Sequence, residues 1–310
     1  MSGLWNGWGL AFRFLVFPGF LFSVVVGLVL TWVDRFVSAR VQWRKGPPFY
    51  QPFADLAKLL LKQTIVPKGA AASVFLLAPL LGFAAMCITS VLLFYVNFHL
   101  QGSFVGDLIV LVYLFALPPL GLILGASASR NPLAAVGASR EMTLYFGYEL
   151  PFLLALVVPI VKSGGAIRLG DIIAAQQVSG PFLYSVSGVI AGLIVLVTIQ
   201  AKLGNVPFDM AEAEQEIMSG VYCEYSGAAL AIFRLTRAMM FFLLPLFLVT
   251  VLWGGLADWW AIPKALAIVV LLILMRNTNP RLRVDQALRF FWFFLGSFGI
   301  IAVILAFLRL

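Results

Sequence analysis

Charged residues, cysteine and histidine are all scarce in this chain. Only 11% of the 310 residues are charged, whereas 62% are hydrophobic, and a soluble domain carries about 25% charged residues. A soluble fold of this length leaves about a quarter of its extended-chain surface in water, so it cannot hide this many apolar side chains. The composition therefore excludes a soluble domain, and it equally excludes a disordered chain. Lipid must be the solvent for much of the sequence.

The supply of cysteine and histidine ligands is limited to Cys87, Cys223 and His99. These three residues cannot ligate an iron–sulfur cluster, a structural zinc ion or a pair of haems. Two cysteines also give no disulfide framework. Any redox centre must therefore belong to another chain, and we expect no cofactor and no metal on this one.

Long apolar stretches are plentiful instead. A membrane-spanning helix needs about 20 mostly apolar residues, and the alternation typical of a membrane barrel is missing. The fold class is therefore an all-α polytopic membrane protein, a single membrane domain over residues 1–310. About eight transmembrane helices are expected at residues 11–33, 73–97, 107–127, 142–161, 182–201, 235–256, 259–275 and 290–309.

The net charge of +8 is distributed unevenly along the chain. Most of the 21 lysines and arginines follow the odd-numbered spans, and most acids lie there too. The positive-inside rule explains this bias, so no nucleic-acid partner is invoked. It places both termini on the outer side of the cell membrane and the charged loops in the cytoplasm, where a partner or a reaction belongs. These cytoplasmic loops cover about residues 34–72, 128–141, 202–234 and 276–289.

The first cytoplasmic loop predicts a short amphipathic helix. Gly46-Pro47-Pro48 breaks the chain, and Pro52 suits the first turn of a new helix. Asp55, Lys58 and Lys62 then share one face of a helix that is too short to span a bilayer. It is expected to lie in the membrane interface, either as an anchor among headgroups or as a docking platform for a partner. The docking residues are Arg44, Lys45, Gly46, Pro47, Tyr50, Gln51 and Asp55.

The third cytoplasmic loop carries five carboxylates in sixteen residues. If Pro207 opens a helix that Gly220 ends, then Asp209, Glu212 and Glu216 fall on one face, with Glu214 pointing elsewhere. An enclosed face of like charges could take up and release protons. The alternative is a solvated acidic face, or salt bridges to basic residues. The available partners are Arg234 and Arg237.

Glu149 is the one acid placed inside an expected span. A carboxylate in a membrane helix is costly, and it usually faces the bundle interior and serves a function. The alternative is that the span begins after Glu149 and leaves it at the interface. Arg140 and Glu141 flank the same region and can pair with these charged groups.

Taken together, these segments resemble the membrane anchor subunit shared by respiratory complex I (its H-type subunit) and the energy-converting, group 4 membrane-bound NiFe hydrogenases. The resemblance covers nearly the whole chain. The motifs that carry it are Arg44-Lys45-Gly46-Pro47-Pro48-Phe49-Tyr50-Gln51, Gly137-Ala138-Ser139-Arg140-Glu141, Val206-Pro207-Phe208-Asp209-Met210-Ala211-Glu212-Ala213-Glu214-Gln215-Glu216, Glu224-Tyr225-Ser226-Gly227 and Pro280-Arg281-Leu282-Arg283-Val284-Asp285.

One departure from the family pattern favours one of its branches. The quinone-reducing branch carries Glu-Thr-Asn-Arg shortly before its Pro-Phe-Asp, whereas this chain has Lys202-Leu203-Gly204-Asn205 there. The missing Glu and Arg put a bound quinone in doubt and favour the hydrogenase-like branch.

The resemblance implies a subunit without a catalytic motif of its own. It would dock a peripheral electron-transfer module and couple electron transfer to proton or sodium translocation. The iron–sulfur clusters and the NiFe centre would lie on hydrogenase-like large and small subunits and an iron–sulfur subunit, with antiporter-like subunits in the membrane. The ion-coupling residues would be Glu141, Glu149, Asp209, Glu212, Glu214, Glu216 and Glu224, and the balancing charges Arg140, Arg234 and Arg237.

Three alternatives remain open. One is the quinone-site subunit of a complex I-type oxidoreductase, and another is a sulfur-reducing relative. A stand-alone secondary transporter is the third, and the crowding of charge on one face of the membrane disfavours it.

Overall fold

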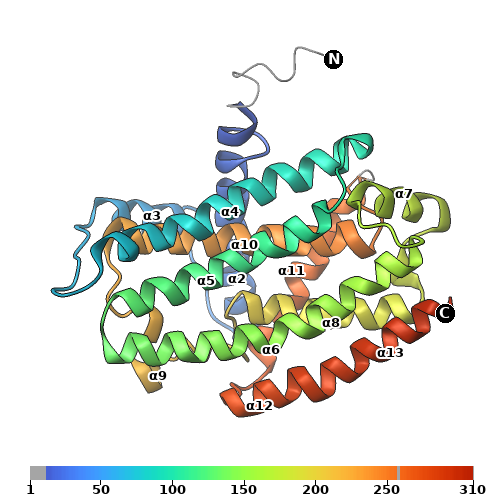
Figure 1. Cartoon of the computed structure of the whole chain (residues 1–310). Coiled ribbons are helices and arrows are strands. Elements are labelled where there is room, and N and C mark those ends of the chain that lie inside the picture. Colours follow the sequence, from blue (N-terminus) through green and yellow to red (C-terminus); the bar gives the residue numbers. More distant parts are fainter. Residues whose placement is uncertain (1–11, 257–258, 310) are drawn as a thin grey trace. The chain divides into compact units, whose positions relative to one another are not determined.

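The computed structural model describes residues 12–256 and 259–309, and within these residues it contains helices and no strands. Within these same ranges, seven helical segments are long and apolar enough to cross a membrane. They are Phe12–Val41, which includes α2 (Phe20–Val41), α4 (Ala72–Phe98), α5 (Asp107–Ala128), α6 (Pro132–Lys162), α10 (Gly227–Leu252), α11 (Ala261–Thr278) and Val284–Phe307 (Figure 1). The prediction of an all-α polytopic membrane protein is confirmed.

The last of these segments is built from three consecutive pieces. They are α12 (Val284–Arg289), the π-helical turn η5 (Phe290–Leu295) and α13 (Gly296–Phe307). The remaining expected span is α8 (Val186–Lys202), whose 17 residues put it at the short end of the range for a spanning helix. α8 packs against α13 and α11 (Figure 1).

Shorter helices occupy the connections. α3 (Gln51–Leu61) is the helix expected in the first loop, and Pro52 lies in its first turn. α7 (Leu169–Ser179) was not predicted, because its apolar residues are too few for a span. The others are α9 (Glu214–Ile217) and the 3-10 turns η2 (Leu100–Gly102), η3 (Phe182–Tyr184) and η4 (Gly220–Tyr222).

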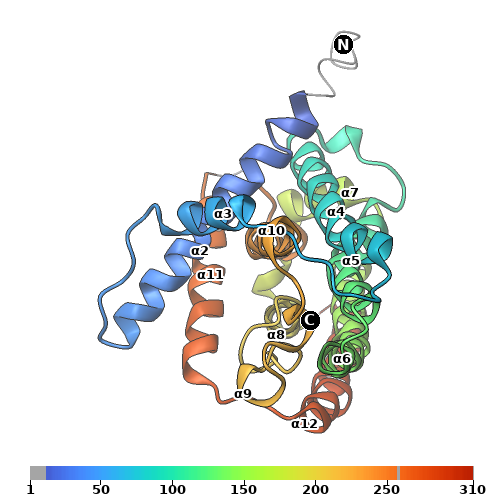
Figure 2. The same cartoon turned by 90° about the vertical axis from the view of Figure 1, so that its left-hand side faces the viewer.

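The helices form two compact units. Unit 1 comprises Met1–Phe94, Leu111–Ala138 and Glu212–Leu243. Within it, α3 lies against α2 (Figure 2). Unit 2 comprises Tyr95–Val110, Ser139–Ala211 and Leu244–Leu310, and α8 lies within it.

Two helices begin earlier than the hydropathy pattern predicted. α6 begins at Pro132, because the Leu133 N–H donates to the side-chain oxygen of Asn131 (2.8 Å) and proline suits a first helical turn. α10 begins at Gly227, where the Ala228 N–H donates to Thr64 Oγ1 (3.1 Å). Large parts of the predicted loops 128–141 and 202–234 are therefore helical. Arg140, Glu141 and Arg234 lie on helices.

Most prolines inside the apolar segments do not end their helices. Pro79, Pro118, Pro119, Pro151, Pro159 and Pro245 all remain inside helices. Pro18 is the exception, because the helix is interrupted over residues 16–19 before α2 begins. Neighbouring helices that re-satisfy the freed backbone groups make such prolines tolerable in lipid.

Candidate functional site

The acidic segment after α8 is not the helix that its sequence predicted. Pro207 opens no helix, and the chain stays irregular until the four residues of α9. α9 ends where Met218 and Ser219 adopt left-handed backbone conformations, with φ of 50° and 68°. The prediction that Asp209, Glu212 and Glu216 share one helical face is therefore wrong. Tertiary contacts hold this segment in place of helical hydrogen bonds.

The part of this segment that belongs to unit 2 makes several such contacts. The Asp209 carboxylate forms an ion pair with Arg281 at 2.8 Å, and only 12% of the Asp209 side chain is exposed. The Leu282 N–H donates to the carbonyl oxygen of Pro207 (3.1 Å). Phe208 is buried, with its ring centroid 4.8 Å from that of Phe291. The structure thus joins two of the sequence motifs, around Asp209 and around Arg281, which lie far apart in the chain.

Glu149 lies well inside α6, as predicted, and it has a cationic partner that the sequence analysis missed. Lys202, the last residue of α8, places its Nζ 2.6 Å from the Glu149 carboxylate. The Lys202 side chain is fully buried, and Glu149 is 16% exposed. The Lys202 ammonium also lies 4.8 Å from the ring centroid of Tyr148 and 4.5 Å from that of Phe152. A lysine ending an apolar helix was the available signal, but sequence spacing does not reveal a partner 53 positions away.

Three further polar side chains of unit 2 belong to the predicted site. The Gln200 side chain donates to the Val206 carbonyl (2.7 Å) and so fixes the start of the irregular segment. Arg140 donates to the Met210 carbonyl (3.4 Å), which places its guanidinium next to the Asp209 loop. Glu141 is buried, with 5% of its surface exposed.

In unit 1, Glu212 and Arg237 form a two-point ion pair. Arg237 Nη1 lies 2.9 Å and 2.7 Å from the two carboxylate oxygens, and the side chains are 23% and 35% exposed for Glu212 and Arg237. This is the salt bridge that the alternative interpretation of the acidic segment anticipated. Glu216 and Arg234 are both exposed. Glu214 contributes its backbone to α9, and its side chain lies outside what the structure describes.

The segment around Glu224, in unit 1, forms contacts with residues that are distant in the sequence. The Glu224 carboxylate accepts a short hydrogen bond from the Asn131 amide (2.5 Å). The next residue, Tyr225, is buried, stacks on Phe75 at 4.1 Å between centroids, and donates to the Phe75 carbonyl (3.0 Å). Burial raises the pKa of Tyr225 well above its ordinary value, so it remains a neutral donor.

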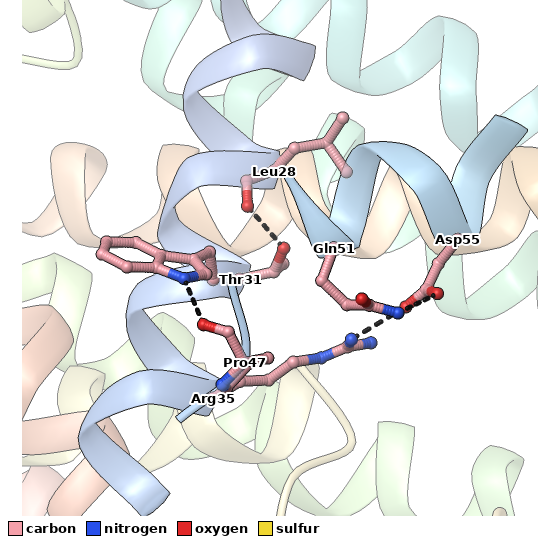
Figure 3. A network of polar contacts seen from close by, with 7 residues as sticks. Leu28, Thr31, Arg35, Pro47, Gln51 and Asp55 are labelled. Atoms are coloured by element: carbon pink, nitrogen blue, oxygen red, sulfur yellow. Dashed lines mark hydrogen bonds and ion pairs between the residues drawn. The ribbon is translucent and has the colours of Figure 1, made fainter. Parts of the chain in front are cut away.

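The predicted docking loop is fastened to α2 in unit 1 (Figure 3). Trp32 donates to the Pro47 carbonyl (3.0 Å), and Arg35 pairs with Asp55 (2.9 Å). Gln51 donates to the second Asp55 oxygen (2.9 Å). The Arg35 hydrogen bond is the main reason that the pKa of Asp55 lies below its usual value. The predicted docking residues Arg44, Lys45 and Tyr50 remain exposed.

Possible metal ligands do not gather anywhere in the described residues. Across 12–256 and 259–309, no three His, Cys, Asp or Glu side chains lie together as a metal site would require. Several charged groups form pairs of opposite sign instead. They are Glu149–Lys202, Asp209–Arg281, Glu212–Arg237, Arg35–Asp55 and Arg283–Asp285.

The helices and ion pairs define a polytopic helical membrane protein with paired charges in each of its units. Residues 14–307 match the model of the NADH dehydrogenase family, and the chain belongs to that family. It is 36% identical to the H-type subunit of an NADH-quinone oxidoreductase from Thermomicrobium roseum, over 88% of each chain. The corresponding subunit from Bacillus mycoides is 32% identical, over 93% of this chain and 91% of that one.

A solved structure shares the fold as well. A chain in the structure of a membrane-bound sulfane sulfur reductase, described as an archaeal respiratory membrane complex, superposes with a TM-score of 0.81. It is 26% identical, and the match covers 92% of this chain and 96% of that one. The resemblance to the membrane anchor subunit of complex I is thereby confirmed.

Proposed function

We propose that this chain is the membrane anchor subunit of an energy-converting redox complex of the membrane-bound NiFe hydrogenase type. It docks the peripheral electron-transfer module and couples electron transfer to proton or sodium translocation. Its partners are hydrogenase-like large and small subunits, an iron–sulfur subunit and antiporter-like membrane subunits. The partners carry the iron–sulfur clusters and the NiFe centre, because this chain offers too few ligands for either.

The observation that carries the proposal is the buried Glu149–Lys202 ion pair. Transfer of one proton from Lys202 to Glu149 converts two charges into a neutral pair, without changing the net charge of the site. Ionisable groups this close interact strongly with each other, so a charge arriving nearby can shift the pair between its two states. Moving one charge across 100 mV requires about 2.3 kcal/mol, and a pKa change of two units corresponds to about 2.7 kcal/mol. The energy needed to change the protonation of a few coupled carboxylates is therefore comparable to the energy of moving one charge across the membrane.

Two other branches of the family each have support. The names of the NADH-quinone oxidoreductase relatives favour a quinone-site subunit of a complex I-type oxidoreductase. The structural neighbour favours a sulfur-reducing complex. Lys202 and Asn205, in place of the quinone branch's Glu and Arg, favour the hydrogenase type.

Purification of the intact complex in mild detergent separates these branches. We expect nickel and iron to co-purify with this chain, and hydrogen production by the complex. Iron without nickel, together with inhibition by quinone analogues, would identify the quinone branch. Sulfide production without nickel would identify the sulfur-reducing branch, and a stable lone protein with substrate-dependent flux would support a transporter.

Replacing Glu212 and Glu216 together with glutamine tests the ion-coupling role of the acidic segment. The amide oxygen introduced at position 212 still accepts from Arg237, so assembly should survive. Loss of the titratable carboxylates should lower ion-coupled turnover by about tenfold, equivalent to about 1.4 kcal/mol. The measurement is ion uptake per electron in vesicles that contain the complex. Asp285→Asn is the matched control, because the Asp285 side chain is 56% exposed and pairs with Arg283 at the surface. Unchanged coupling in the double variant would remove these acids from the mechanism.

We further propose that the complex lies in the cell membrane, with the loops around residues 34–72, 128–141, 202–234 and 276–289 on the cytoplasmic side. The distribution of Lys and Arg supports this orientation. A single cysteine introduced at Lys45, in a chain lacking its two native cysteines, should react with an impermeant thiol reagent only in inverted membranes. Labelling of that introduced cysteine in intact cells would reverse the proposed topology.

A further inference from the structure

A second polar cluster lies in unit 2, away from the acids discussed above. It joins the segment after η2, the start of α5 and the start of α7. Asp107 is fully buried, and one of its carboxylate oxygens accepts from the N–H groups of Leu108 (2.8 Å) and Leu169 (2.7 Å). Arg168 donates from Nη2 to the carbonyl oxygen of Ser103 (2.5 Å). These bonds bring Ser103, Asp107 and Arg168 into one neighbourhood.

Each of these three residues has a buried polar atom that the protein itself does not satisfy. Within the described part of the chain, Ser103 Oγ, Asp107 Oδ2 and Arg168 Nε have no hydrogen-bond partner. More than about 90% of buried polar groups in native proteins are partnered, so three unpartnered atoms in one cluster require an explanation. Among the described contacts, Arg168 forms no direct ion pair with Asp107.

We propose that Ser103, Asp107 and Arg168 bind one ordered water molecule. The water donates one hydrogen to Asp107 Oδ2, and its oxygen accepts from both the Ser103 hydroxyl and Arg168 Nε–H. One molecule thereby satisfies all three atoms, and about three hydrogen bonds are usual for a buried water. It also bridges the guanidinium to the carboxylate that it does not reach directly.

The charges of the cluster select water over an ion. A metal cation placed beside Asp107 would face the guanidinium of Arg168, and an anion placed beside Arg168 would face the buried carboxylate. Ser103 Oγ lies close to the first turn of α7, because a Cβ added at Gly170 would lie only 2.7 Å from it. The site therefore ties the start of α7 to the start of α5 through a neutral ligand.

High-resolution cryo-electron microscopy of the intact complex in lipid nanodiscs tests this site directly. We expect a density peak within hydrogen-bonding distance of Ser103 Oγ, Asp107 Oδ2 and Arg168 Nε. An empty site, a direct Arg168–Asp107 ion pair, or a peak at the shorter distances of a metal ion would each overturn the proposal.

A conservative variant gives a second readout. Arg168→Lys keeps the positive charge but lacks both the Nε–H donor to the water and the Nη2 donor to the Ser103 carbonyl, so the water loses one of its three partners. The Leu169 amide, which donates to Asp107, should then exchange with deuterium about tenfold faster, and the density peak should disappear. Arg234→Lys, at an exposed position, is the control and should leave exchange at Leu169 unchanged. Unchanged exchange in Arg168→Lys, with the peak retained, would contradict the assigned role of Nε.

Discussion

Replacing Lys202 with Met is expected to destabilise the chain by about 3–5 kcal/mol, because it removes one partner of a buried ion pair. Glu149 would be left with an uncompensated charge in a largely apolar surrounding, or would have to take up a proton. The measurement is the thermal unfolding of the purified complex in nanodiscs, together with its quantity in membranes. Arg283→Met, which breaks the exposed Arg283–Asp285 pair, is the control and should cost at most about 1 kcal/mol.

The paired variant Lys202→Met with Glu149→Met separates stability from function. Apolar residues of similar size in place of both charges should restore stability to within about 1–2 kcal/mol of the native chain. Ion-coupled turnover should remain lost, because neither residue can then carry a proton. Normal coupling in the paired variant would eliminate the pair from the proposed mechanism. A Lys202→Met chain as stable as the native one would show that the buried pair is not what holds α6 to α8.

The second large effect is expected for Gly227→Ala, at the first residue of α10. Gly227 has a φ of +59°, and a Cβ there would lie 2.7 Å from both the Lys62 carbonyl oxygen and Thr64 Oγ1. Backbone strain of about 1–2 kcal/mol adds to the cost of moving the neighbouring segment, about 1–3 kcal/mol. We expect a fall in thermal stability and faster hydrogen exchange around Ser226, which accepts from the Ile65 N–H.

Gly164→Ala is the matched control for this substitution. Gly164 also has a positive φ, of +79°, but a Cβ there would meet nothing within 4 Å. It therefore carries the backbone strain without the collision. Equal losses of stability in the two variants would mean that close packing between residues 62–64 and Gly227 contributes nothing.

The sequence predicted the helices of the membrane part well, but it missed the starting points of α6 and α10. Hydropathy reports how long a helix remains apolar, so it located α4, α5 and α11 within a few residues. It did not detect the polar first turns of α6 and α10, whose starts depend on caps from Asn131 and Thr64. The short helix α3 was predictable, because Gly-Pro-Pro followed by Pro52 is a local signal.

In the candidate site, too, the sequence predicted some features and could not predict others. Glu149 could be found from the sequence, because a carboxylate within an apolar span is rare. Its partner Lys202 could not, because the ion pair depends on how α6 and α8 pack. The acidic segment was assigned to a helix from the spacing of its carboxylates, yet Asp209 instead pairs with Arg281 and Glu212 with Arg237.

By itself the amino-acid sequence determined the lipid surroundings of this protein and its helical class, because composition and long apolar runs are properties of the chain alone. Its local motifs also carried the resemblance to its family. Only the tertiary structure decided which acid meets which base. Ion pairs and buried hydrogen bonds join residues that are tens or hundreds of positions apart, and no local pattern encodes those distances.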